Sequence, residues 1–124
     1  IVWDVGHQSY SYKLLTGRAN EFENLRQFNG CCGFPVRNEN EFECYSAGHA
    51  GVAISAALGI CAAQKTVDKS KVVAVVGDGA IASGVALEGL NQVRTHGRNL
   101  VIVLNDNKMA IPFLEPPADF RFNM

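Results

Sequence analysis

The stretch Val75-Val76-Gly77-Asp78-Gly79-Ala80 decides the fold, together with Leu104-Asn105-Asp106-Asn107-Lys108-Met109 further along the chain. Each polar cluster follows a nearly continuous run of β-branched and aliphatic residues, Lys71–Val76 and Leu100–Leu104 respectively. Such runs are typical of strands buried on both faces of a parallel sheet. The sequence therefore predicts that each cluster lies where a buried strand ends.

The segment between the two strands has the pattern of a helix. Residues 81–96 carry apolar side chains at helical spacing, and Gly97 stands where a helix C-terminal cap is expected. A right-handed crossover puts the carboxyl ends of consecutive parallel strands on the same edge of the sheet, where such folds bind ligands. The sequence therefore predicts a βαβ unit with both polar clusters at one edge.

Both clusters have the residue types of a site for a divalent metal that carries a diphosphate. Gly77 and Gly79 allow a tight turn, and the amides that follow them at a helix start favour an anion. Mg²⁺ prefers octahedral oxygen coordination and commonly keeps phosphate and water ligands. The Asp78 carboxylate, the Asn107 side-chain carbonyl and a main-chain carbonyl near Met109 would leave room for two diphosphate oxygens and a water. Either cluster alone is more often an ordinary turn, so the prediction depends on their conjunction.

Two histidines come from earlier segments that the same topology can bring to this edge. The expected strand Ile1–Trp3 runs into a polar loop that contains His7, which we expect to form a third loop facing the site. Residues 46–51 contain Gly48 and His49 and open a helix, 52–65, that is apolar on all sides and is therefore expected to be buried. Each histidine taken alone is more often a structural residue than a functional one.

The remaining segments are expected to be scaffold. Asn20 is the expected N-cap of a helix with an apolar face of Phe22, Leu25 and Phe28, and residues 29–43 are expected to be a loop. Cysteines 31, 32, 44 and 61 have no metal or redox spacing, so we expect reduced, inert thiols.

Composition narrows the class of protein. The chain has 124 residues, of which 48% are hydrophobic and 19% charged, as expected of one globular domain. The net charge of −1 gives no electrostatic argument for nucleic acid or an anionic membrane. The longest apolar stretch, 52–63, is too short to span a bilayer. The first residue is Ile1 rather than Met, so we expect the chain to be an internal piece of a longer protein. We also expect a cytoplasmic location.

These motifs resemble those of thiamine-diphosphate enzymes, and in particular the 1-deoxy-D-xylulose-5-phosphate synthase family. The resemblance covers roughly residues 1–111 and leaves 112–124 as a divergent, irregular tail. It implies an α/β fold with a mostly parallel sheet and flanking helices, as in a thiamine-diphosphate-binding domain. The matching segments appear in the family's order: Trp3–Tyr10, Lys13–Arg18, Gly33–Pro35, Ser46–His49, Gly77–Ile81 and Leu104–Met109.

The resemblance also implies roles for individual residues. Asp78, Asn107 and the main-chain oxygen of Met109 match the Mg²⁺ ligands of the family. His7 and His49 match histidines near the cofactor that handle protons. The cofactor-binding residues implied for thiamine diphosphate are His7, Gly48, His49, Ala50, Gly79, Ala80 and Asn107.

The implied reaction joins pyruvate, after loss of CO₂, to glyceraldehyde 3-phosphate, and its product feeds isoprenoid and thiamine synthesis. A homodimer is expected, together with a pyrimidine-binding domain that supplies an activating glutamate and that no segment here resembles. The sequence differs from the family's pattern in two places. After His49, Ala50 to Ala53 replace hydroxyl residues, and the residues after Met109 also diverge. Two alternatives therefore stay open: a transketolase-like enzyme, and a non-catalytic module that binds the cofactor. A Rossmann dinucleotide domain is disfavoured because no G-x-G-x-x-G follows a strand.

Overall fold

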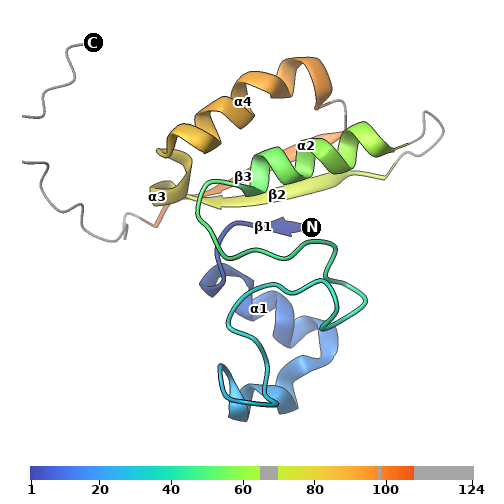
Figure 1. Ribbon diagram of the computed structural model, residues 1–124, viewed down its shortest axis with the longest axis vertical. Helices are drawn as coiled ribbons and strands as arrows, with labels where there is room; N and C mark the ends of the chain where they lie inside the picture. Colours follow the sequence, from blue (N-terminus) through green and yellow to red (C-terminus); the bar gives the residue numbers. More distant parts are fainter. Residues whose placement is uncertain (65–69, 98, 108–124) are drawn as a thin grey trace, which may run out of the picture.

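Within the part of the chain that the structure describes, three parallel strands form one sheet in the order β1-β2-β3 (Figure 1). The computed structural model describes residues 1–64, 70–97 and 99–107. The strands are β1 (Val2–Trp3), β2 (Val72–Gly77) and β3 (Leu100–Asn105). Val2 lies opposite Ala74, and Gly77 lies opposite Asn105, so the carboxyl ends of β2 and β3 are level with each other. The predicted strands and their parallel arrangement are confirmed.

Helices α2 (Ala53–Ala63) and α4 (Gly84–His96) lie over one side of this sheet (Figure 1). The short helix α3 (Asp78–Ile81) begins at the residue after β2. The α/β fold class with a mostly parallel sheet and flanking helices is therefore confirmed. None of the described helices has both the length and the apolar character needed to cross a membrane. The predicted tail, 112–124, lies outside the described residues.

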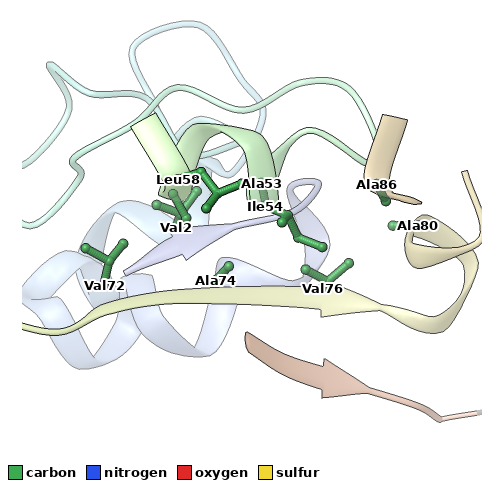
Figure 2. Packing of buried hydrophobic residues seen from close by; sticks show 10 residues of the cluster. Val2, Ala53, Ile54, Leu58, Val72, Ala74, Val76, Ala80 and Ala86 are labelled. Carbon is green, nitrogen blue, oxygen red and sulfur yellow. The ribbon is translucent and has the colours of Figure 1, made fainter. Parts of the chain in front are cut away.

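The hydrophobic core lies between the sheet and α2, as Figure 2 shows. Ala53, Ile54 and Ala57 of α2 are fully buried, and so are Ala74 and Val76 of β2. Small side chains let the helix come close to the strands, and burying them removes apolar surface from water. The other buried members of the core are Val2, Leu58, Val72, Ala80 and Ala86.

The strands are not buried on both faces, contrary to the expectation from their apolar runs. Along β2, Val72, Ala74 and Val76 are buried and the residues between them are half-buried. Along β3, Val101 and Val103 are 45% and 44% exposed. The reason is that the described helices α2 and α4 cover one side of the sheet, so alternate side chains of β3 point away from the core.

The helical segment after β2 is interrupted, where the sequence predicted one continuous helix over 81–96. α3 ends at Ile81 and α4 begins at Gly84, because Ser83 leaves the helical conformation and its hydroxyl accepts a hydrogen bond from the Ala86 amide at 3.3 Å. The predicted cap at Gly97 is confirmed, since its amide donates to the Val93 carbonyl.

Helix α2 is shorter and less buried than predicted. It ends at Ala63, and the predicted end at residue 65 lies outside the described residues. Ser55 and Gly59 are exposed, so the expectation of burial on all sides is wrong. An apolar composition made of small residues does not distinguish a wholly buried helix from one that covers a single face of a sheet.

A lobe made of residues 7–47 extends from the β1 edge of the sheet, away from α4 (Figure 1). It contains the short helices η1 (His7–Ser9), α1 (Tyr10–Lys13), η2 (Leu14–Arg18) and η3 (Ala19–Asn24). The predicted N-cap at Asn20 is wrong. The helical conformation is interrupted at Gly17, where φ is 91°, and η3 already begins at Ala19. Phe28 is 95% exposed and forms no apolar face. The predicted loop over 29–43 is confirmed, since no helix or strand lies there.

Four charged side chains hold this lobe together. Lys13 is fully buried and donates to the main-chain carbonyls of Cys32 and Phe34 and to the Glu39 carboxylate. Arg18 donates to Glu39 at 2.9 Å and to Glu43 at 2.7 Å. Burial acts to raise the pKa of Glu39, but hydrogen bonds from Lys13 and from the Cys32 amide outweigh it and lower that pKa. The sequence motifs gave no sign of this buried network.

Candidate functional site

The carboxyl edge of the sheet brings the two polar clusters together. Gly77 and Asn105, the last residues of β2 and β3, are direct neighbours across the strands. Asp78 follows at the start of α3 and is half-buried, and Asn107 follows two residues after β3 and is exposed. Gly77, the residue before α3, has no side chain and therefore cannot cap the first amides of this helix. The predicted meeting of both clusters at one edge is confirmed.

The predicted metal ligands are only partly described. Asp78 supplies a carboxylate and Asn107 an amide oxygen, the hard oxygen donors that Mg²⁺ prefers. Met109 lies outside the described residues. Among the residues that are described, no group of three or more His, Cys, Asp or Glu side chains is placed to hold a metal. The predicted set includes one carboxylate, so its donors fit a cation that keeps phosphate and water among its ligands.

Gln8 connects the first polar loop to the ends of both neighbouring strands. Its side-chain nitrogen donates to the Asp4 carbonyl, and its side-chain oxygen accepts from the Asn105 side chain, each at 3.2 Å. A Cβ atom built on Gly77 would lie 3.0 Å from the Gln8 nitrogen, so the two residues are in close contact. His7 is adjacent to Gln8 and is exposed at the start of η1. The structure thus places the loop that contains His7 beside the ends of β2 and β3, while the role of His7 stays a prediction.

The loop that carries Gly48, His49 and Ala50 is fixed to the end of β1 by a buried carboxylate. Asp4 follows β1 and is 0% exposed. Its two oxygens accept from the Gly51 amide at 2.9 and 3.0 Å, and one of them also accepts from the Ala53 amide at 3.1 Å. The three residues of the loop are themselves exposed, and its main chain is held next to β1.

Gly51 is also packed against the segment that follows the Gly-Asp-Gly turn. Its φ is 86°, a conformation that favours glycine. A Cβ atom here would lie 2.1 Å from the Ser83 hydroxyl and 3.6 Å from the Ala80 carbonyl. Glycine is therefore required at this position, which gives a structural reason for Gly51 but not for Ala50, Val52 or Ala53. The predicted residue Ala80 is thereby close to the end of the His49 loop.

Sequence reasoning missed Asp4, Gln8, Gly51 and Ser83 as parts of this site. Asp4 and Gln8 stand within a polar run at a strand end, which was the available signal. The contact between Asp4 and the Gly51 amide, 47 positions later in the chain, cannot be inferred from residue spacing or hydrophobic periodicity.

A hollow of about 330 Å³ lies elsewhere, between α2 and α4. Ser55, Glu88 and His96 are among its lining residues, and none of the predicted site residues is. The hollow therefore belongs to the helical layer and not to the carboxyl edge of the sheet. We assign the candidate site from the arrangement of the strand ends instead.

Comparison with known proteins gives one consistent family. The sequence profile described as 1-deoxy-D-xylulose-5-phosphate synthase matches residues 1–113. The synthase of Clostridium perfringens (strain SM101 / Type A) is 53% identical over 112 residues, which are 90% of this chain and 18% of that protein. The synthases of Desulforudis audaxviator and Anaeromyxobacter dehalogenans (strain 2CP-C) are 54% and 56% identical over the same lengths.

The parallel sheet, its flanking helices and the polar carboxyl edge define an α/β domain of the thiamine-diphosphate-binding class. Within this class the comparisons are specific. The chain belongs to the 1-deoxy-D-xylulose-5-phosphate synthase family. It spans about a fifth of the length of the relatives quoted, namely 18%.

Proposed function

We propose that this chain is the part of a 1-deoxy-D-xylulose-5-phosphate synthase that binds the diphosphate of thiamine diphosphate through Mg²⁺. One observation carries the proposal: three chain segments that hold the candidate residues meet at one edge of the sheet. Gly77 and Asn105 end neighbouring strands, Gln8 bonds to Asn105, and Asp4 holds Gly51. The family match supports a transferase of isoprenoid biosynthesis.

The residues at this edge fit the cofactor by their chemistry. Asp78 and Asn107 supply hard oxygen donors from adjacent strand ends, and Met109 would add a main-chain oxygen. The amides of Gly79 and Ala80 lie in the first turn of α3, where an anion is favoured. Gly48, His49 and Ala50 are exposed in the loop that Gly51 anchors beside Ala80. These residues would hold the metal and the diphosphate together.

In the proposed reaction, pyruvate loses CO₂ and its remaining two carbons are joined to glyceraldehyde 3-phosphate. Thiamine diphosphate, when bound, supplies the nucleophilic carbon and the electron sink that this reaction needs. His7 and His49 are exposed, so both imidazoles are accessible to a substrate and can serve as proton donors or acceptors. We further propose a homodimer, a cytoplasmic location and a pyrimidine-binding domain that completes the site.

The first test replaces the proposed metal ligand. In the full-length protein, Asp78→Ala should weaken binding of thiamine diphosphate with Mg²⁺ by about 10²-fold or more, because one charged ligand is lost. Calorimetric titration measures the affinity, and CO₂ release from pyruvate measures the activity. Glu88→Ala is the matched control, since Glu88 is exposed on α4.

The outcomes separate the alternatives. Loss of affinity in Asp78→Ala alone supports the metal assignment, and an unimpaired Asp78→Ala variant overturns it. A parent protein that binds the cofactor with Mg²⁺ but releases no CO₂ from pyruvate would be a binding module rather than an enzyme. A parent that accepts ketose phosphates as two-carbon donors in place of pyruvate would be transketolase-like.

A further inference from the structure

Asp4 makes contact with three different segments through its three polar groups. Its amide donates to the Val75 carbonyl of β2 at 2.8 Å. Its carbonyl accepts from the Gln8 side chain at 3.2 Å. Its carboxylate accepts from the amides of Gly51 and Ala53 at 2.9 to 3.1 Å. One residue therefore ties together the strand before Asp78, the helical turn of His7 and the loop of His49.

We propose that Asp4 is a positioning residue of the cofactor site, whose buried carboxylate sets the place of the Gly48–Gly51 loop relative to His7 and Ala80. The proposal rests on the proposed function, because it concerns the same site. Asp4 touches neither reacting atoms nor cofactor in this assignment. It acts through the main chain of the loop, which has no other side-chain cap at the start of α2.

The carboxylate is suited to this task by its charge and its burial. Asp4 is 0% exposed, and an ionised carboxyl group only accepts hydrogen bonds, so it matches two amide donors without conflict. The amides belong to the start of α2, where a negative charge is also favoured by the helix dipole. A buried acceptor that bridges two amides holds the loop more firmly than a surface contact would.

Asparagine at this position keeps the shape and loses this match. The Gly51 amide lies 2.9 and 3.0 Å from the two carboxylate oxygens, so whichever way the asparagine amide is turned, its NH₂ group faces the Gly51 amide, donor against donor. We expect the loop to loosen and the affinity for thiamine diphosphate with Mg²⁺ to fall about tenfold, because a donor now faces the buried Gly51 amide. Asp4→Ser is a second variant that offers one hydroxyl acceptor and no NH₂ group, and it should change the affinity in the same direction.

Glu43→Gln is the matched control. Glu43 is 4% exposed and binds Arg18 in the lobe, so this variant also removes a buried carboxylate charge without changing its shape. Its hydrogen bonds within the described part of the chain go to Arg18 and Asn40, which belong to the lobe. We therefore expect it to lower the melting temperature while its affinity for the cofactor stays within about twofold of the parent.

The experiment compares the full-length parent with these variants by calorimetric titration, thermal unfolding and amide hydrogen exchange without cofactor. Support requires weaker binding and faster exchange over residues 48–53 in the Asp4 variants, and neither change in Glu43→Gln. Unchanged exchange and affinity in Asp4→Asn overturns the inference, and so does an equal loss of affinity in Glu43→Gln. If Asp4→Asn does not fold, Asp4→Ser is judged by the same criteria.

A failure of the proposed function can be told apart from a failure of the positioning role of Asp4. A parent that does not bind thiamine diphosphate at all overturns both the function and the positioning of a cofactor site. A parent that binds normally while the Asp4 variants bind equally well overturns the positioning role alone. The two failures are thus distinguished by the parent protein's own titration.

Discussion

Burial separates the cysteines at the scale of single residues. Cys31 is 1% exposed, and burial raises the pKa of its thiol, with the nearby Lys13 acting in the opposite direction. Cys44 is exposed at the surface of the lobe. Because the thiolate is the reactive form, the raised pKa and the burial both favour an inert Cys31, in line with the sequence interpretation.

We therefore expect Cys44 to be alkylated well before Cys31. The measurement is iodoacetamide labelling of the full-length protein at pH 8, followed by peptide mass spectrometry. Cys44→Ser should remove the fast labelling of this segment, and Cys31→Ser should leave it unchanged. Fast labelling of Cys31 in the folded protein would contradict the expectation.

The candidate site shows what single residues reveal in the sequence. Asp78 and Asn107 were predicted because each follows a strand of strongly apolar residues. Asp4 was not, because its role depends on a contact with Gly51, and such a contact exists only once the chain has folded. Gly51 itself was interpreted as a departure from the family, whereas its φ of 86° makes glycine necessary.

At the scale of elements, strands were predicted more accurately than helix ends. β2 and β3 were predicted to within one residue at each end, because β-branched runs leave few alternatives. The break between α3 and α4 was missed, since Ser83 interrupts the apolar spacing without a proline or an unusual composition. A local hydroxyl-to-amide bond decides this boundary, and periodicity does not report it.

The cap of α4 gives a prediction for this element. Ser83→Ala removes the hydroxyl that accepts from the Ala86 amide, so we expect a loss of about 1 kcal/mol of stability. Urea unfolding of the full-length protein, followed through the transition that includes this segment, measures the loss. Ser11→Ala at an exposed position of α1 is the control and should change the stability by less than about 0.5 kcal/mol. Equal effects of the two changes would argue against the cap.

At the scale of the whole molecule, the sequence predicted the fold class and the parallel order of the strands, but not how the lobe is held. Its stability depends on Lys13, Arg18, Glu39 and Glu43, which come from two segments and meet only in the folded chain. Charged residues in a sequence are usually interpreted as solvated, so their burial had no signature. The half-exposed face of β3 had no signature in the sequence either, because an apolar run does not show which side of the sheet a helix covers.

This network predicts how the protein responds to acid. The pKa of Glu39 is lower in the folded protein than its ordinary value of 4.5, so its contribution to stability is present above that pH and is lost as the pH falls through the folded value. The melting temperature of Glu39→Gln should therefore be below that of the parent at pH 7, and the gap should close below about pH 4.5.

Thermal unfolding of the full-length protein between pH 3 and 7 measures this gap. Glu41→Gln serves as the control, since Glu41 is exposed on the same loop and should follow the parent at every pH. A gap between Glu39→Gln and the parent that stays constant down to pH 3 would show that the Glu39 carboxylate does not supply the pH dependence.

The pairing of β1 with β2 has a consequence for the kinetics of folding. Val2 lies opposite Ala74, and the Asp4 carboxylate accepts a hydrogen bond from the Gly51 amide, 47 positions further along the chain. Closing such long loops costs entropy before any contact is gained, so pairings of this kind form slowly and late. As the ribosome releases the chain, β1 cannot pair with β2 until β2 has emerged. During synthesis, β1 therefore lacks its β2 neighbour for the time that the intervening segment takes to be made.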